Sequence, residues 1–163
     1  MLPNTKYLKR DEKFDTAQAD VKDMFRTFSF QVPADIYVLA HATAPFPKST
    51  SIDEGIRAVK SGQFDSAIAV KKMQEFIWKD SKPFNYNPLK ILRTQDLELL
   101  YVETTGLYIF TQAVIRERKS RIGANPYMLE VTPIEAIDIN NPVDFEIANA
   151  INEKTIKKGK YNE

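Results

Sequence analysis

The side chains available for chemistry in this chain of 163 residues are carboxylates, hydroxyls, amides and amines, because it has no Cys and a single His, His41. Without Cys there are no disulfides, no thiolate zinc site and no cysteine nucleophile. A single His rules out a multi-histidine metal site. A bound metal would be held by carboxylates, carbonyls, water and substrate oxygens, which favours Mg²⁺ over Zn²⁺.

Two parts of the chain carry polar side chains of these kinds next to a predicted strand or helix. His41 directly follows the apolar run 36–40, and Asp138 and Asn140 come just before a predicted helix that starts at Pro142. On the residues alone, His41 is either a structural or a substrate-binding side chain. Asp138 and Asn140 form either a turn and helix cap or a ligand site at a strand end.

Alternating strand and helix patterns position these residues and predict an α/β fold. Short β-rich apolar runs predict strands at 36–40, 64–70, 106–111 and 126–131. Apolar residues at helical spacing predict helices at 16–28, 51–61, 112–117 and 142–151. Ser51 and Glu54 are predicted to form a capping box, and Phe145, Ala148 and Ile151 to face inward.

The first two strands and the helix between them predict a right-handed βαβ unit with a parallel pair. Residues 71–96 interrupt the alternation with Trp, Pro and Asn, so we expect an excursion that forms a lid or a subunit contact. The remaining pattern predicts one domain, residues 1–163.

Composition narrows the class of partner. The chain carries 23 Lys and Arg against 22 Asp and Glu, spread along the sequence, which disfavours nucleic acid. No apolar run approaches the roughly 20 residues that cross a bilayer, so we expect no membrane contact and a cytoplasmic location.

Five short segments in fixed order carry a family resemblance: 41–46 (HATAPF), 103–110 (ETTGLYIF), 121–123 (RIG), 135–140 (EAIDIN) and 144–149 (DFEIAN). Together they resemble the sugar cytidylyltransferases that activate sialic acid and related nine-carbon acids as CMP conjugates. The resemblance implies a nucleotide-diphospho-sugar transferase-like fold, with a mostly parallel sheet and flanking helices. It also implies CTP and a sialic-acid-like sugar as substrates, Mg²⁺ as cofactor, release of pyrophosphate, and a homodimer formed through residues 71–96.

The resemblance assigns the metal and catalytic role to Asp138, with Asn140 where the family has a second carboxylate. It assigns nucleotide contact to Arg10. It assigns substrate contact to seven further residues: His41, Thr43, Lys79, Arg93, Gln95, Thr104 and Tyr108. Arg93 would suit the sugar carboxylate, because guanidinium offers a planar fork of donors.

The sequence also departs from the family pattern. Asn140, Ala44 and Glu103 each remove a group that the family uses. The family's opening strand and its Gly, Ser, Arg and Lys rich CTP loop have no counterpart here, so we expect an N-terminally truncated member of the fold. The alternative is a truncated, inactive homologue that binds a sugar acid or mediates assembly.

Overall fold

The computed structural model describes residues 5–16 and 18–159. Its main sheet has four strands in the order β1 (Ile36–Ala40), β5 (Leu100–Thr111), β2 (Ser66–Met73) and β6 (Pro126–Glu130). β5 runs antiparallel to β1 and to β2, whereas β2 and β6 are parallel. Three strands therefore share one direction, and the predicted α/β fold with a mostly parallel sheet is confirmed.

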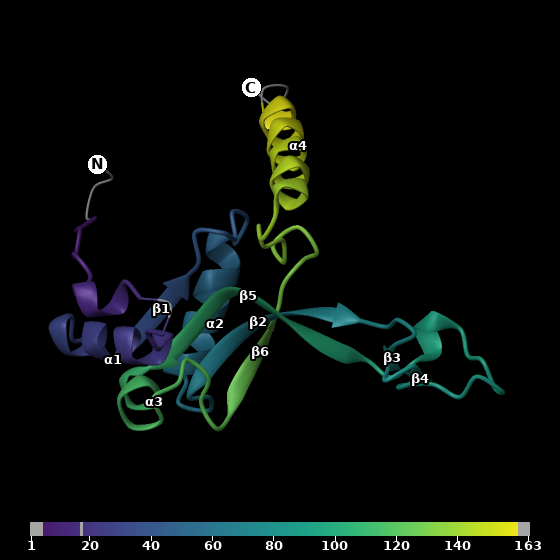
Figure 1. Ribbon diagram of the computed structural model, residues 1–163, viewed down its shortest axis with the longest axis horizontal. Helices are drawn as coiled ribbons and strands as arrows, with labels where there is room; N and C mark the ends of the chain where they lie inside the picture. Colours follow the sequence, from purple (N-terminus) through teal and green to yellow (C-terminus); the bar gives the residue numbers. More distant parts are fainter. Residues whose placement is uncertain (1–4, 17, 160–163) are drawn as a thin grey trace.

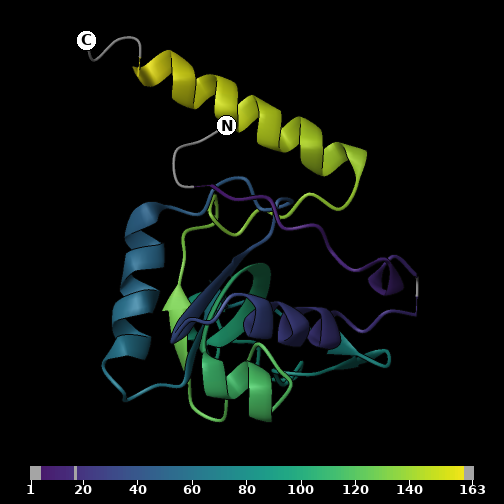
Figure 2. The ribbon, with the colours of Figure 1, turned by 90° about the vertical axis from the view of Figure 1, so that its left-hand side faces the viewer.

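Helices cover both faces of this sheet. The helices α1 (Val21–Gln31) and α3 (Gln112–Glu117) lie on one face, and α2 (Ser49–Lys60) lies on the other (Figure 2). Successive side chains of β5 point to opposite faces of the sheet. Tyr108 and Phe110 pack in the core under α1 and α3, whereas Leu107 and Ile109 pack in the core under α2. The result is a three-layer body around two apolar clusters.

The predicted βαβ unit is wrong in one respect. β1 and β2 point the same way, but β5 lies between them and pairs with both. Local patterns identify strands without fixing their order, and a strand that arrives later in the chain can take the place between two earlier ones. Gly55 in α2 allows the close approach to this inserted strand, since a Cβ there would lie 2.4 Å from Cδ1 of Ile109.

Two helix starts also differ from the prediction. α1 begins at Val21, because the carboxylate of Asp20 accepts from the backbone N–H of Lys22 at 2.8 Å. Before it lies a short 3₁₀ turn, η1 (Glu12–Phe14). α2 begins at Ser49, so the predicted capping box does not form, and the Ser51 hydroxyl instead donates to Oε1 of Glu135 at 2.6 Å.

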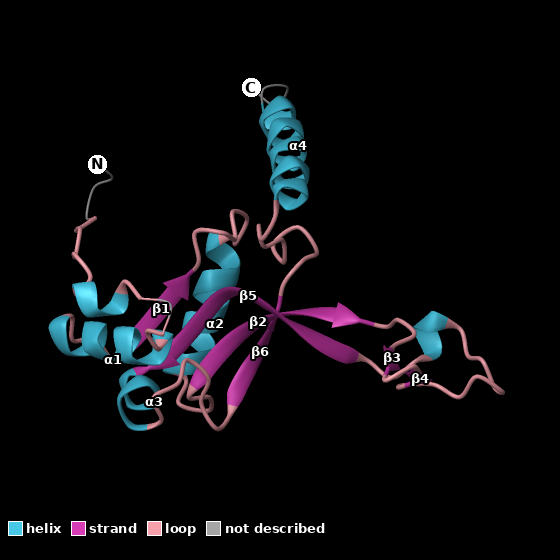
Figure 3. Ribbon diagram, viewed as in Figure 1, coloured by secondary structure: helices cyan, strands magenta, loops and turns pink. Residues whose placement is uncertain are grey.

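The outer halves of β2 and β5 leave the body as a two-stranded arm, which we define as residues 71–102 (Figures 1 and 3). Its far end holds the hairpin of β3 (Trp78–Lys79) and β4 (Lys82–Pro83) and the turn η2 (Thr94–Asp96). Asp80 and Ser81 have positive φ of 50° and 58°, as a tight two-residue hairpin turn requires. The predicted excursion at 71–96 is thus a projecting arm.

The last helix, α4 (Pro142–Gly159), stands apart from the three layers (Figures 1 and 2). Ala148 is buried as predicted, but Phe145 is 61% exposed, so the prediction of an inward Phe145 is wrong. Across residues 5–16 and 18–159, no helix combines the length and the apolar character that crossing a membrane demands.

Candidate functional site

Three segments far apart in the sequence converge at the carboxyl end of β1. They are the turn at 41–44, the middle of β5 at 103–106, and the loop at 138–140. The backbone joins them, with the His41 N–H donating to the Gly106 carbonyl at 3.0 Å and the Ile139 N–H donating to the Thr43 carbonyl at 2.9 Å. Ligands bind open α/β sheets at such carboxyl ends.

β5 is irregular where it passes this point. Its pairing with β2 shifts register between Ile68 and Val70, so a bulge forms around Thr105. Thr105 has φ of 58°, a left-handed conformation that a β-branched residue rarely adopts. The Thr104 hydroxyl is buried and donates to the Ala69 carbonyl at 3.1 Å. The bulge therefore turns the Thr105 side chain toward the 138–140 loop and uses Thr104 to hold β5 to β2.

Asp138 is the carboxylate at the centre of the convergence. Its Oδ2 lies 2.9 Å from the Thr105 hydroxyl and 3.1 Å from the side-chain nitrogen of Asn140. The Thr43 hydroxyl beside it, and then the Thr105 and Asn140 donors, lower the pKa of Asp138 against the opposing effect of burial. Its other oxygen, Oδ1, is buried and has no hydrogen-bond partner among the described residues.

His41 and Tyr108 form the neighbouring wall, with ring centres 6.1 Å apart. The Tyr108 hydroxyl donates to Glu103, and burial together with this bond raises the pKa of Tyr108 far above its ordinary value. Arg121 lies over the Tyr108 ring, 3.9 Å from its centre, and 3.7 Å from Oε1 of Glu103. Nε2 of His41 is buried and has no partner in the described part of the chain.

Glu135 holds the loop that carries Asp138. Its side chain is only 3% exposed and accepts from the hydroxyls of Ser51 at 2.6 Å and Thr132 at 2.8 Å, and from the Lys48 backbone N–H at 3.3 Å. Burial raises the pKa of Glu135, but these donors outweigh it and the net pKa is lowered. The start of α2 and the 132–138 loop are thereby fixed to each other.

The residues present offer Mg²⁺ a partial site. Within the described ranges, no group of three or more His, Asp or Glu side chains is placed to hold a metal. The free Oδ1 of Asp138 suits a cation that takes one or two carboxylates and completes its shell with water and phosphate. Asn140 turns its NH₂ group toward Asp138, so its predicted role as a ligand requires rotation of the amide.

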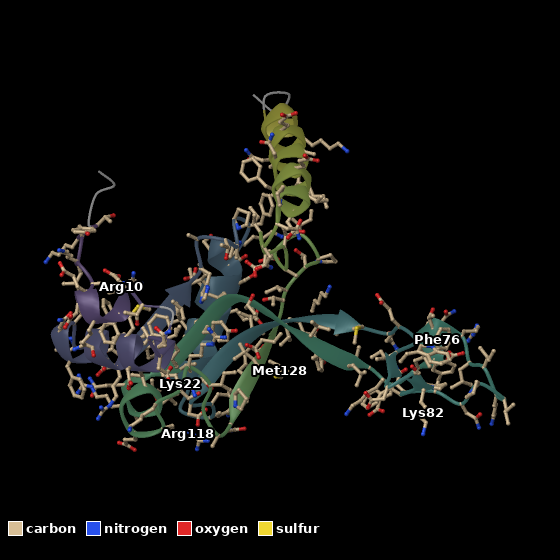
Figure 4. All side chains as sticks on the ribbon, in the orientation of Figure 1. Arg10, Lys22, Phe76, Lys82, Arg118 and Met128 are labelled. Carbon is tan, nitrogen blue, oxygen red and sulfur yellow. The ribbon has the colours of Figure 1, made fainter. Side chains whose placement is uncertain are left out.

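The structure brings His41, Thr43, Thr104, Tyr108, Asp138 and Asn140 together. It places Arg10 elsewhere, paired with Asp15 in a hollow between the N-terminal segment, α1 and β1. Lys79, Arg93 and Gln95 lie on the arm, whose distance from the body is visible at Phe76 and Lys82 (Figure 4). Arg93 there pairs with Asp96 at 2.7 Å. Within one chain, the four are not part of the cluster.

Sequence reasoning missed two contributors. The conformation of Thr105 depends on a bulge between strands that are distant in the sequence, and no local pattern predicts that bulge. Lys71 borders a hollow of about 250 Å³ with Asp138, Asp144 and Ile147. It comes one residue after the predicted strand 64–70, so the rule that ligands bind at carboxyl ends could have identified it.

The layered sheet, with a cluster of polar side chains at the carboxyl end of β1, defines an α/β protein of the kind that binds ligands at strand ends. The cytidylyltransferase family model matches residues 5–159, and the chain belongs to this family. The fold is similar to a solved CMP:2-keto-3-deoxy-manno-octonic acid synthetase complexed with CTP, with a TM-score of 0.59 at 14% identity. The match covers 85% of this chain and 70% of that one. Among curated proteins, none matches the chain.

Proposed function

We propose that this protein transfers CMP from CTP to the hydroxyl of a sialic-acid-like sugar acid and releases pyrophosphate. Family membership supports the cytidylyl transfer. The observation that carries the site is the Asp138 carboxylate, with one oxygen held by hydroxyl and amide donors and the other buried without a protein partner.

Cytidylyl transfer requires the protein to position the two substrates and to neutralise phosphate charge, more than to supply a reactive side chain. The sugar oxygen must approach the α-phosphorus in line with the departing pyrophosphate. Mg²⁺, when bound, would neutralise part of the triphosphate charge. Asp138 would hold it on Oδ1, and the lowered pKa of Asp138 keeps that oxygen anionic at neutral pH. His41 and Thr43, in the turn at 41–44 beside the Asp138 loop, would orient the acceptor.

The arm fits a homodimer within this proposal. It exposes Trp78 and Phe84 at 59% each, Leu89 at 95% and Ile91 at 70%, which is a large apolar surface for one excursion. A second copy would cover it. The same pairing would carry Lys79, Arg93 and Gln95 of one chain toward the site of the other, where their predicted substrate contacts would become possible.

The principal test measures pyrophosphate release from CTP, in the presence of Mg²⁺, with each of two acceptors: N-acetylneuraminate, a nine-carbon acid, and 2-keto-3-deoxy-manno-octonate, an eight-carbon acid. Asp138→Ala should reduce turnover at least a hundredfold, as loss of a pre-organised electrostatic group does. Asp53→Asn, on the exposed surface of α2, is the matched control and should match the parent. Equal turnover in Asp138→Ala and Asp53→Asn would remove Asp138 from the site.

A binding or assembly protein is the second candidate, favoured by one observation. Asn140 presents a donor to Asp138 where a two-carboxylate metal clamp would present a second anion. Magnesium-dependent CTP binding, measured by calorimetry, separates the two candidates, because the transferase requires it. Sugar-acid binding with no CTP binding would favour the second candidate.

A further inference from the structure

The outer surface of α1 and α3 carries an exposed aromatic ring close to two arginine side chains. Phe30 of α1 is 55% exposed. The guanidinium carbon of Arg116, in α3, lies 4.6 Å from the centre of the Phe30 ring, and that of Arg26, in α1, lies 5.5 Å from it. Arg118 and Lys119 follow directly after α3 and are exposed (Figure 4). We define Arg26, Phe30, Arg116, Arg118 and Lys119 as the basic patch.

The positive charge of the basic patch is not neutralised within residues 5–16 and 18–159. None of its four cations forms an ion pair there, and the carboxylates of Asp23 and Glu117, exposed on the same two helices, pair with none of them. The two guanidinium groups near Phe30 are attracted to the same ring and carry the same charge, so they repel each other. An anionic partner would relieve this repulsion.

The Arg116 side chain is fixed in place by the protein itself. Its Nη2 donates to the Ser29 carbonyl, its Nε donates to the Ser29 hydroxyl at 3.4 Å, and Ser29 is 0% exposed. Nε of Arg26 is buried and has no hydrogen-bond partner among the described residues. A side chain held in this way loses little conformational entropy when a partner binds. Arginine and aromatic side chains are also enriched among the residues that carry the binding energy of protein interfaces.

The helix α4 presents a surface of the opposite charge. Asp144, Ala148 and Ile151, at helical spacing, form its inner stripe, in which Ala148 is 5% exposed and the other two are partly buried. Away from this stripe, Phe145 is 61% exposed, and Glu146 is exposed and forms no ion pair with the described residues. Residues 142–153 contain three Asp or Glu and no Lys or Arg. An exposed aromatic ring and a free carboxylate therefore lie next to each other in an acidic segment.

We propose that α4 docks, through Phe145 and Glu146, on the basic patch of a second copy of this chain. The Glu146 carboxylate would accept from the guanidinium groups, and Phe145 would cover the Phe30 ring. The α4 helix stands apart from α1 and α3 of its own chain, so the contact forms between copies (Figures 1 and 2).

Two-fold symmetry would let each copy give its α4 and receive that of the other, so the contact is made twice in one dimer. The arm has no part in this contact. Copies that pair through the arm as well would therefore assemble into a tetramer.

The experiment isolates this contact in the Leu89→Glu chain, because a charge at the apolar tip of the arm opposes pairing there. Sedimentation velocity over a concentration series, without CTP, measures the dimer dissociation constant. Adding Glu146→Lys or Phe145→Ser should raise that constant about tenfold or more, and adding Arg118→Glu several-fold. Glu146→Lys combined with Arg118→Glu should recover most of the loss, since opposite charges again face each other. Asp53→Lys, an equal change of charge on the exposed surface of α2, is the matched control and should change nothing.

Each other outcome overturns the proposal. A Leu89→Glu chain that is monomeric at every concentration overturns it, and so do equal dissociation constants for the Glu146→Lys and Asp53→Lys proteins. A combined Glu146→Lys and Arg118→Glu protein that associates no more tightly than Glu146→Lys alone would refute the pairing of α4 with the patch. Melting curves of each variant at low concentration confirm that it is folded, and a lower melting temperature there in Glu146→Lys would assign the contact to a single chain instead.

The inference does not depend on the proposed function, because association is measured without substrates. Association through α4 in a chain that releases no pyrophosphate from CTP would uphold this inference and overturn only the proposed reaction.

Discussion

The body and the arm of this chain bury their apolar residues to different degrees. In the body, both faces of the sheet are covered, and Tyr108, Ile109 and Leu129 are at most 1% exposed. In the arm, whose residues are all described, Leu97 alone is buried. Trp78 and Phe76 contact Tyr86 with ring centres 6.3 Å and 4.6 Å apart, yet Trp78 remains 59% exposed.

The difference indicates two sources of order. Burial of apolar area stabilises the body from within. The arm is held at its base by polar contacts, since Lys72 pairs with Glu130 at 2.7 Å and the Tyr101 hydroxyl donates to Glu130 at 2.9 Å. The apolar side chains at its tip are not covered by other parts of the chain, which is why we propose that a second copy of the chain covers them. The cluster around Asp138 belongs to the body and should be assembled without the arm.

The largest expected effect compares one apolar residue from each region. Ile109→Ala removes a side chain that is 0% exposed and should cost about 3 to 4 kcal/mol of unfolding free energy, from lost burial and the cavity left behind. Leu89→Ala, at 95% exposed, should change it by less than about 0.5 kcal/mol. Urea unfolding of both variants measures the contrast. Similar losses would mean that the arm is part of the folding core.

The second prediction tests the partner of the arm. Leu89→Glu places a charge in the apolar surface of the tip and should weaken self-association by about a hundredfold, or roughly 2.7 kcal/mol, within the range for an interface hot spot. The melting temperature extrapolated to low concentration should stay at that of the parent. Light scattering across a concentration series measures the change. A parent chain that is monomeric throughout would refute the homodimer.

Elements of the body could be predicted from the sequence because their signals are local. Within about a dozen residues, the sequence shows both the apolar spacing and the turn residues that mark each of three elements: the strands at 36–40 and 126–130 and the helix at 112–117. The place of β5 between β1 and β2 could not be predicted in this way, because strand order depends on how whole strands pair and pack and not on local patterns. The start of α2 was also beyond local patterns, because Glu135 satisfies its first turn from 84 residues away.

The candidate site divides along the same line. Asp138, Asn140, His41 and Thr43 were predicted through short motifs, and the structure brings them together. Lys79, Arg93 and Gln95 were placed in the same site by motif order, but they lie on the arm. Motif order gives the succession of the segments and carries no information on how far apart they lie in the folded chain.

A third prediction concerns pH and tests how firmly the body holds the Asp138 loop. Glu135 has a lowered pKa in the folded state, so it contributes stability above its ordinary value of 4.5 and loses that contribution as the pH falls below it. Glu135→Gln should cost about 1 to 2 kcal/mol at pH 7, because donors that now meet a charge would meet a neutral amide. Unfolding curves from pH 7 to pH 3 should show the two proteins converging.

The matched control for this measurement is Glu153→Gln, on the exposed surface of α4. It should leave both the stability at pH 7 and its pH dependence close to those of the parent. A constant difference between parent and Glu135→Gln from pH 7 to pH 3 would show that the loss comes from shape rather than charge.

The smallest effect is expected at Thr105, where the body itself departs from regular structure. Thr105 and Lys119 have positive φ of 58° and 50°, and asparagine tolerates this conformation better than either. Thr105→Asn and Lys119→Asn should each raise the unfolding free energy by about 0.5 to 1 kcal/mol, measured in urea. Only Thr105 contacts Asp138, so only Thr105→Asn should alter turnover. A gain in stability with a loss of turnover at Thr105, and no loss at Lys119, would show that the strained bulge serves the reaction rather than the fold. Equal turnover in both variants would mean that the bulge is only the way in which β5 passes from the body into the arm.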